Sequence, residues 1–349
     1  MRLGLNMGYW GMGNDKDNLQ LAREADSLGY SVIWVAEAYG SDAATVLSWV
    51  GAQTSSVDIG SSVFQIPART PAMTAMTAAT LDTLSDGRFR LGLGVSGPQV
   101  SEGWHGVRFD SPLGRTREYV DIVRLALSRE RLAYSGKHYV LPLPDGPGKA
   151  LKLTVHPVRD RIPIYLAAVG PKNLELCGEM ADGWLSIFPS VRNLDDSLAP
   201  IRAGRAKAGA TLEGFDVVAG VGLNLDPDIE RGSQLLKANA ALYIGGMGSR
   251  EKNFYNAHAH RLGYGDAAGV IQDRYLSRDY EGAAAAVPTE LIDDTALLGP
   301  VERVAEKLAA YAGAGVTTVS ISPASTSMDE RLAALHGAAE ALQKSGAGS

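Results

Sequence analysis

A carboxylate and a histidine are the side chains of this chain that could do acid–base chemistry. Glu37 follows the apolar run 32–35 and could hydrogen-bond a ligand or move a proton, unless it is a surface-loop carboxylate. His105 could act as an acid or a base near neutral pH. An equally open interpretation has His105 packing behind a pocket while Trp104 fills a gap in the core.

Two segments could hold a ligand through their backbone. Gly170-Pro171-Lys172 stands where a helix would begin, and the free N–H groups and dipole of a helix start attract an anion. A plain strand-to-helix turn is the alternative there. The stretch Gly60-Ser61-Ser62-Val63-Phe64-Gln65 ends an apolar strand shortly before Pro67, and proline interrupts regular strand pairing. Its small serines would let the backbone bend towards a flat ligand, or they simply end the strand.

Strands alternating with helices must position these residues. Eight apolar strands are predicted, over 3–6, 32–35, 57–64, 89–95, 162–167, 184–187, 215–221 and 316–321. Helical spacing is found over 19–28, 71–84, 113–133, 172–181 and 301–312. The pattern predicts an α/β fold, a (β/α)₈ TIM barrel in a single domain over 1–349, with insertions over about 134–160 and 226–296. A doubly wound open sheet is the alternative, and the lack of G-x-G-x-x-G after the first strand disfavours it.

In such a barrel the active site lies where the strands end. The predicted strand ends are rich in glycine, aromatic and small residues, with one carboxylate, few basic groups and no metal-ligand cluster. They are Met7-Gly8-Tyr9-Trp10, Glu37-Ala38-Tyr39, Ser62-Val63-Phe64-Gln65, Ser96-Gly97-Pro98-Gln99, Ala168-Val169-Gly170-Pro171-Lys172 and Ser186-Ile187-Phe188. Such a wall suits a large planar cofactor better than a hydrolytic water, and no metal is expected.

Composition places the chain among ordinary globular proteins. Of its 349 residues 45% are hydrophobic and 21% are charged. No apolar run approaches the ~20 residues of a membrane span, and the N-terminus becomes polar too soon for a secretory signal. Cys177 is the one cysteine, which excludes an internal disulfide. A cytoplasmic protein is therefore expected, and a net charge of -6 gives no support for nucleic-acid binding.

A set of short motifs, in order along nearly the whole chain, resembles the luciferase-like flavin and deazaflavin oxidoreductases. Within them it is most similar to the actinobacterial branch that uses coenzyme F420. The matching stretches are Gly40-Ser41-Asp42, Ser61-Ser62-Val63 with Ala68-Arg69-Thr70-Pro71, Gly87-Arg88 with Gly92-Leu93-Gly94, Glu102-Gly103-Trp104-His105-Gly106 with Arg115-Thr116-Arg117-Glu118-Tyr119, Gly170-Pro171-Lys172 with Ala181-Asp182-Gly183-Trp184, and Gly299-Pro300 with Gly313-Ala314-Gly315-Val316.

The resemblance implies an enzyme that transfers a hydride between coenzyme F420 and a small organic substrate. It implies a non-proline cis peptide bond at Ser62–Val63, behind the cofactor ring, and a phosphate near Ala168, Val169 and Gly170. The cofactor-binding residues would be Ser62, Val63, Gln65, Ser96, Gly97, Ala168, Val169, Gly170, Pro171 and Lys172, and the catalytic residues Glu37 and His105. Relatives are often dimers, so a homodimer is expected, without a nucleic-acid or membrane partner.

Two positions depart from the relatives. Some of them have a catalytic histidine where this chain has Ala38, and those that oxidise sugar phosphates carry a glutamate near Gln99. Their substrate therefore cannot be transferred to this chain. An FMN-dependent monooxygenase and a non-catalytic deazaflavin-binding barrel remain alternatives.

The second insertion contains two features of open meaning. Residues 243–248, rich in glycine, would serve as a lid or as a simple turn between helices. His258 and His260 are expected on an exposed helix face rather than at a metal.

Overall fold

Eight parallel strands close into a barrel in the computed structural model, which describes residues 1–10, 15–325 and 327–348. The strands, in their order around the barrel, are β1 (Arg2–Asn6), β2 (Val32–Val35), β3 (Asp58–Ser61), β5 (Phe89–Gly94), β8 (Ile164–Ala167), β9 (Gly183–Ile187), β10 (Asp216–Asn224) and β12 (Thr318–Pro323). β12 pairs with β1 in parallel and completes the ring. The predicted (β/α)₈ barrel is confirmed, and the open sheet is wrong.

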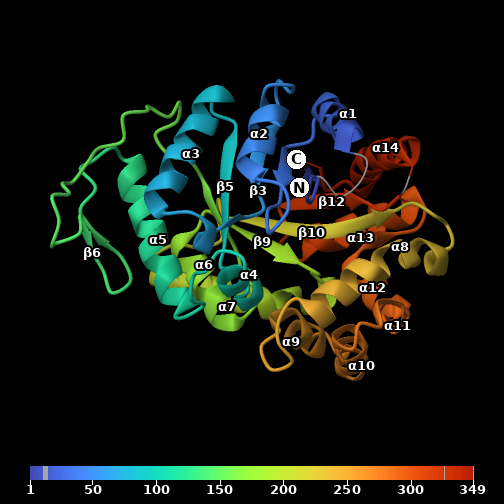
Figure 1. The fold of residues 1–349 in the computed structure, drawn as a ribbon. Coiled ribbons are helices and arrows are strands. Elements are labelled where there is room, and N and C mark those ends of the chain that lie inside the picture. Colours follow the sequence, from blue (N-terminus) through green and yellow to red (C-terminus); the bar gives the residue numbers. More distant parts are fainter. Residues whose placement is uncertain (11–14, 326, 349) are drawn as a thin grey trace.

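Helices cover the outside of the barrel (Figure 1). Those predicted from the sequence are α1 (Asp15–Ser27), α3 (Pro71–Leu84), α5 (Pro112–Leu127), α6 (Pro171–Met180) and α13 (Val301–Gly313). α5 ends six residues earlier than expected. The helices that the sequence did not predict are α2 (Ala43–Gly51), α4 (Pro98–Gly103), α7 (Leu194–Lys207) and α14 (Met328–Ser345).

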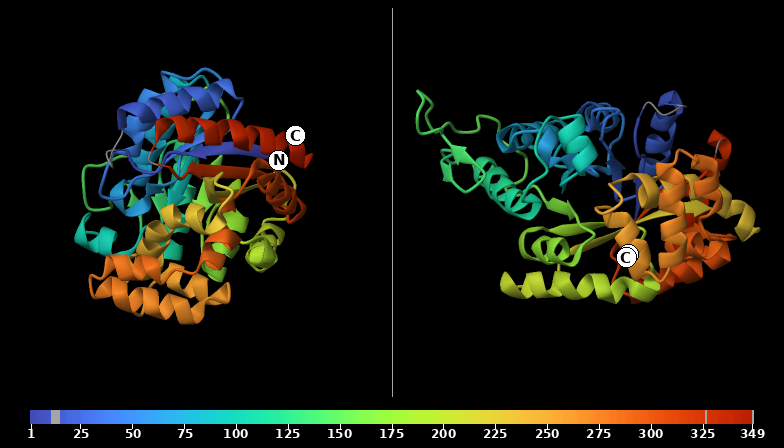
Figure 2. Two further views of the ribbon diagram at one scale, coloured as in Figure 1. Left: turned by 90° about the vertical axis from the view of Figure 1, so that its right-hand side faces the viewer. Right: turned by 60° about the horizontal axis from the view of Figure 1, so that its bottom comes forward.

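Both predicted insertions are present. The first holds a small hairpin, β6 (Tyr134–Ser135) and β7 (Val140–Leu141), and projects away from the barrel (Figures 1 and 2). The second consists of α8 (Ile229–Ala241), the π-helix η3 (Leu242–Gly246), α9 (Phe254–Arg261), α10 (Gly265–Leu276), α11 (Tyr280–Ala285) and α12 (Thr289–Thr295). It has an apolar core of its own, which includes Ile244, Ile271 and Leu291. The strand β11 (Leu297–Leu298) leads from it back to the barrel and pairs with β10. The single-domain organisation stays a prediction.

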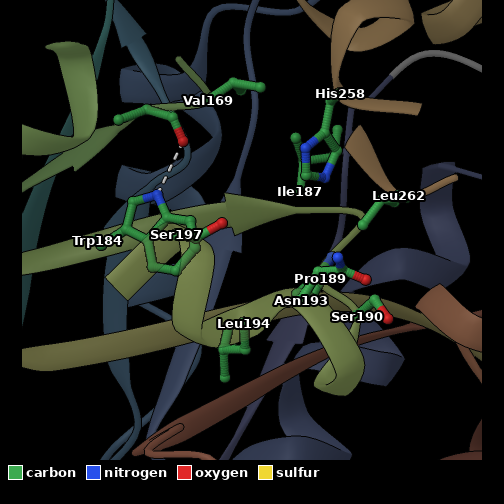
Figure 3. A pocket seen from close by; sticks show the side chains of 11 residues that line it. Val169, Trp184, Ile187, Pro189, Ser190, Asn193, Leu194, Ser197, His258 and Leu262 are labelled. Carbon is green, nitrogen blue, oxygen red and sulfur yellow. Dashed lines mark hydrogen bonds between the residues drawn. The ribbon is translucent and has the colours of Figure 1, made fainter. Parts of the chain in front are cut away.

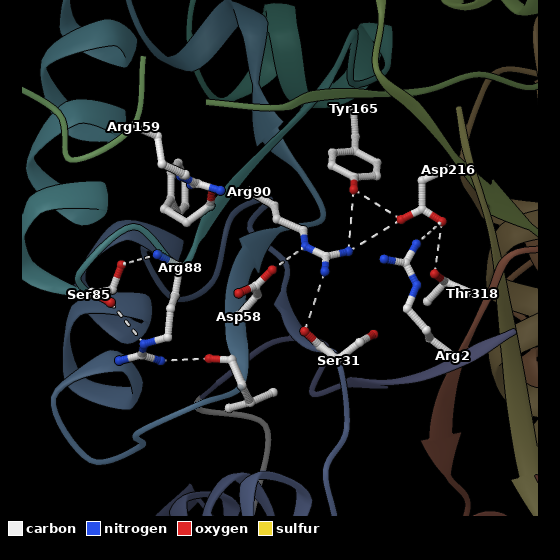
Figure 4. A network of polar contacts seen from close by, with 12 residues as sticks. Arg2, Ser31, Asp58, Ser85, Arg88, Arg90, Arg159, Tyr165, Asp216 and Thr318 are labelled. Carbon is white, nitrogen blue, oxygen red and sulfur yellow. Dashed lines mark hydrogen bonds and ion pairs between the residues drawn. The ribbon is translucent and has the colours of Figure 1, made fainter. Parts of the chain in front are cut away.

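A network of polar residues, with Arg90, Tyr165 and Asp216 buried, closes the barrel at the amino-terminal ends of its strands (Figure 4). Arg90 donates to Asp58 at 2.7 Å and to Asp216 at 3.3 Å, and the Tyr165 hydroxyl donates to Asp216 at 3.0 Å. Burial disfavours the Arg90 charge, but Tyr165 and the two carboxylates outweigh it, so the pKa of Arg90 is raised. This end of the barrel is filled with paired charges and serves stability, which leaves the opposite end for a ligand. Among the described helices, none has the length and apolar character needed to cross a bilayer.

Candidate active site

A cavity of about 1090 Å³ lies between the carboxyl ends of the barrel strands and the second insertion. Every one of the eight barrel strands contributes to it, through its last residues or the loop that follows. Its walls contain all the predicted cofactor-binding residues: Ser62, Val63, Gln65, Ser96, Gly97, Ala168, Val169, Gly170, Pro171 and Lys172. Glu37 also lines the cavity, whereas His105 does not. The residues predicted from the sequence therefore lie at the cavity, while their roles in binding and catalysis stay predictions.

The third barrel strand is interrupted at the cavity wall. β3 ends at Ser61, the Ser62–Val63 peptide bond is cis, as expected from the resemblance, and β4 (Phe64–Gln65) resumes pairing with β5. Glycines make room for this path. A Cβ at Gly92 would lie 1.9 Å from the Ser61 carbonyl oxygen, and one at Gly94 would lie 2.6 Å from Val63 Cγ2. Larger residues at these two positions of β5 would therefore collide with the interrupted strand.

Side-chain hydrogen bonds fix the strand ends beside this bulge. The Ser96 hydroxyl donates to Gln65 Oε1 at 2.6 Å, and Gln65 Nε2 donates to the Ala38 carbonyl at 2.9 Å. Ser96 has a φ of 61°, a left-handed conformation that is uncommon for serine. The ends of β2, β4 and β5 are joined in this way into one rigid part of the wall.

Glu37 is held by an ion pair. Its carboxylate accepts from Arg69 at 2.9 Å and from the backbone N–H groups of Ala43 at 3.1 Å and Gln65 at 3.2 Å. Burial disfavours the Arg69 charge, but Glu37 and Asp42 outweigh it, so the pKa of Arg69 is raised. Glu37 is 9% exposed, so the interpretation of Glu37 as a surface-loop carboxylate is wrong. These contacts support a positioning role better than a proton shuttle.

The start of α6 forms one end of the cavity. Gly170 is the N-cap and Pro171 is the first helical residue, where the missing N–H of proline costs no helical hydrogen bond. The Asn173 and Leu174 N–H groups bond to the Gly170 carbonyl, while the earlier N–H groups of a helix have no partner within it. A Cβ at Gly170 would meet nothing within 4 Å, so there is open space beside this helix start. The geometry suits an anion, which stays a prediction.

The position of His105 does not support a catalytic role. It follows the short helix α4 and lies outside the cavity wall, with its Nε2 atom buried and without a hydrogen-bond partner among the described groups. Trp104 is 66% exposed, so it does not fill a gap in the core. A catalytic role for His105 stays a prediction.

The second insertion forms one wall of the cavity, which is rich in tyrosine, and the sequence analysis did not predict this wall. Tyr243 stands in η3, and its ring makes edge-to-face contacts with Phe188 at 5.7 Å and with Tyr255 at 4.9 Å between centroids. Tyr9, which follows β1, lines the same cavity. The glycine content of 243–248 indicates a lid or a turn, but neither its π-helical form nor its partners far away in the sequence can be predicted from local sequence.

His258 is an exception to the expected exposed helix face. Its Nε2 atom lies 3.1 Å from the Phe188 carbonyl, beside a small cavity of about 10 Å³ (Figure 3). Arg261 donates to the Val169 carbonyl at 3.0 Å and approaches His258 Nδ1 at 3.3 Å. Burial lowers the pKa of His258, and the Arg261 charge lowers it further. A neutral His258 and Arg261 therefore attach α9 to the ends of β9 and β8, while His260 is exposed as expected.

Comparisons with known proteins agree with this geometry. A family model described as luciferase-like monooxygenase matches residues 10–318. A candidate coenzyme F420-dependent oxidoreductase of Mycobacterium tuberculosis, Rv3520c, is 43% identical over 342 residues, which are 96% of this chain and 99% of that protein. The 5,10-methylenetetrahydromethanopterin reductase of Archaeoglobus fulgidus is 28% identical over 300 residues, 84% of this chain and 86% of that protein.

Solved structures share the fold. The coenzyme F420-dependent tetrahydromethanopterin reductase of Methanopyrus kandleri superposes with a TM-score of 0.81 at 22% sequence identity, over 96% of this chain and 97% of that chain. The family match covers most of the sequence, and the fold and the place of the cavity are those expected from the resemblance. The chain belongs to the luciferase-like monooxygenase family.

Proposed function

We propose that this enzyme is an oxidoreductase that transfers a hydride between coenzyme F420 and a small organic substrate. The observation that carries the proposal is the cavity at the carboxyl ends of the strands, whose walls contain all ten predicted cofactor-binding residues. Its volume of about 1090 Å³ exceeds the usual ~300–1,000 Å³ of a single-ligand site, so a cofactor and a substrate can share it. The similarity to a candidate F420-dependent oxidoreductase supports the choice of cofactor.

The residues present fit a deazaflavin with a phosphorylated tail. The bulge at Ser62–Val63 and the fixed Gln65–Ser96 pair would support one side of the ring. The start of α6 at Gly170 would receive the phosphate, with Lys172 as the nearby cation. When bound, the cofactor supplies a ring carbon that gives or takes a hydride. The chain itself supplies orientation and shields the reacting atoms from water with its second insertion.

Titration of the purified protein with F420 and with FMN, followed by fluorescence, tests the proposal. We expect micromolar binding of F420 and much weaker binding of FMN. A preference for FMN, with NADH-driven oxygen uptake, would support the monooxygenase alternative and contradict the proposal. Binding of F420 without turnover on a broad panel of enones, imines and alcohols would favour a non-catalytic barrel.

A matched pair of variants tests the phosphate site. Gly170 has a φ of -84° and open space around it, so a side chain fits there without strain. Gly170→Asp places a carboxylate against the proposed phosphate, whereas Gly170→Asn adds the same bulk without the charge. We expect Gly170→Asp to weaken F420 binding at least about tenfold relative to Gly170→Asn, because like charges ~4 Å apart repel by about 4 kcal/mol near a protein surface. Equal affinities would place the phosphate elsewhere.

We further propose that the enzyme is a homodimer that pairs through α2 and α3. These neighbouring outer helices together contain a single charged residue, Asp82, and it is buried. Their exposed faces instead carry Trp49, Met73 and Met76, which are about half exposed. An exposed apolar patch without charges is typical of an interface between proteins. We place the dimer in the cytoplasm, in keeping with a chain whose one cysteine is buried and free.

A further inference from the structure

The charged side chains of the cavity lie away from the second insertion. Of the described residues that line the cavity, only Glu37 and Lys172 carry a formal charge. Glu37 is paired with Arg69, and Lys172 lies at the start of α6. We call the side of the cavity that residues 229–296 form the insertion wall. Its side chains are uncharged and mostly apolar or aromatic, among them Leu236, Leu242, Tyr243, Phe254, Tyr255 and Tyr275.

Three aromatic rings beside this wall hold one another in place. The Tyr243 ring stands nearly perpendicular to the rings of Phe188 and Tyr255, at 82° and 89°. The backbone of Phe188 has a φ of 49°, which is uncommon for an aromatic residue, and its carbonyl lies 3.1 Å from His258 Nε2. Asn253 Nδ2 donates to the Tyr243 carbonyl at 3.1 Å. These rings are therefore positioned before a ligand binds, which lowers the cost of ordering them.

A fourth ring packs directly on η3. A Cβ at Gly246 would lie 2.4 Å from Tyr275 Cε1, and one at Gly245 would lie 2.5 Å from Tyr275 Cβ. The two glycines thus allow the Tyr275 side chain to approach the backbone of the π-helix, and Tyr275 itself lines the cavity. π-helical turns often occur at functional sites. The glycine content of this segment therefore serves an aromatic surface.

Two further rings line the cavity and are still open to water. Phe254 is the first residue of α9 and is 42% exposed, and Tyr39, in the loop after β2, is 59% exposed. One ring belongs to the insertion and the other to the barrel, so both sides of the cavity offer uncovered aromatic surface. Burial of such a surface by an apolar ligand is favourable, because it removes the surface from water.

We propose that the substrate is an uncharged molecule with a flat apolar ring system, which binds against the insertion wall. This inference rests on the proposed function and names its substrate class. A carboxylate or phosphate on the ring system would lose its water beside a wall without a cation, and such a loss is costly. Flat rings gain from offset and edge-to-face contacts with the aromatic side chains. Phe254 would then determine specificity without taking part in the hydride transfer.

Three ketones test the substrate class without turnover. The enzyme saturated with oxidised F420 cannot reduce a ketone, so calorimetry reports binding alone. 2-Acetylnaphthalene has the proposed flat body, 6-acetyl-2-naphthoate adds a carboxylate to the same body, and cyclohexanone has a smaller one. We expect 2-acetylnaphthalene to bind at least about tenfold more tightly than either of the others, because the naphthoate must desolvate a charge and cyclohexanone buries less surface.

A matched pair of variants tests the place of binding. Phe254→Ala removes an exposed ring from the insertion wall, whereas Leu143→Ala removes an apolar side chain that is 69% exposed on the first insertion and does not line the cavity. We expect Phe254→Ala to weaken 2-acetylnaphthalene at least about fivefold and to leave the Kd of F420 unchanged. Leu143→Ala should match the wild type in both measurements.

The outcomes separate this inference from the function on which it rests. If the wild type does not bind F420, both are overturned. If it binds F420 but binds the naphthoate or cyclohexanone as tightly as 2-acetylnaphthalene, the substrate class is overturned and the proposed function stands. If Phe254→Ala keeps the wild-type affinity for 2-acetylnaphthalene, the ring system lies elsewhere in the cavity. If Phe254→Ala weakens F420 instead, the insertion wall holds the cofactor, and the inference is likewise overturned.

Discussion

Glu37 shows how one side chain can line a cavity and still belong to the scaffold. Its carboxylate accepts hydrogen bonds from Arg69 and from the backbones of Ala43 and Gln65. Ala43 begins α2 and Gln65 ends β4, so a single carboxylate joins a helix, a strand and an arginine. A buried carboxylate with its partners in place is stable as a charge, and it becomes costly only when one partner is removed.

Arg69→Met tests this scaffold role. The Arg69 and Glu37 side chains are 14% and 7% exposed, so the variant leaves an uncompensated buried charge. We expect the free energy of unfolding to fall by about 3 kcal/mol, measured by urea denaturation at pH 7. Arg108→Met serves as the control, because Arg108 is 86% exposed and 4.0 Å from Glu102, and it should change stability by less than about 0.5 kcal/mol. Equal stabilities of the two variants would contradict the scaffold role.

At the scale of elements, one asparagine, Asn253, supports two neighbouring helices, α9 and η3. The side-chain oxygen of Asn253 caps α9 by accepting from the N–H groups of Tyr255 and Asn256. Its side-chain nitrogen donates to the carbonyls of Tyr243 and Ile244. The cap needs only an acceptor, and the π-helix needs only a donor, so the two contributions can be separated by mutation.

Asn253→Asp keeps the helix cap and removes the donor, whereas Asn253→Ala removes both. The Ile244 carbonyl also accepts from Asn256 Nδ2 at 3.3 Å, so of the two carbonyls it is that of Tyr243 that loses its side-chain donor. A buried carbonyl left without a partner costs about 1–3 kcal/mol. We therefore expect the amides of 242–246 to exchange hydrogen at least about tenfold faster in both variants, as measured by mass spectrometry. Wild-type exchange in Asn253→Asp would mean that the cap alone holds this segment.

The sequence predicted those elements whose pattern reflects their burial. The eight strands are apolar runs, and the strand ends are the loops that line the cavity. α2, with the sequence AATVLSWVG, was missed because it has no charged face to show a helical period, and α7 contains Pro200. Tyr9 and Tyr243 are 234 positions apart (243 minus 9), and only the folded barrel brings both into the wall of one cavity. Local patterns contain no information about such a pair.

At the scale of the whole molecule, the absence of exposed charge on α2 and α3 predicts a self-association that one added charge would prevent. We expect the wild type to sediment at twice the monomer mass and Met76→Glu to sediment as a monomer, because Met76 is 51% exposed on α3 and a carboxylate there would face an apolar partner. Val270→Glu is the control, since Val270 is similarly exposed on α10 of the insertion. Dimers of both variants would place the interface elsewhere.

The attachment of α9 to the barrel has a thermodynamic consequence. Arg261 bonds the Val169 carbonyl, in the same loop that leads into the start of α6, and His258 bonds the Phe188 carbonyl at the end of β9. A ligand that orders the loop at 168–172 therefore stabilises the attachment of the insertion to the barrel. In turn, a substrate that holds the insertion against the barrel raises the affinity of the loop for that ligand. The cofactor must then change the affinity for the substrate by the same factor by which the substrate changes the affinity for the cofactor. This coupling does not require contact between the two ligands.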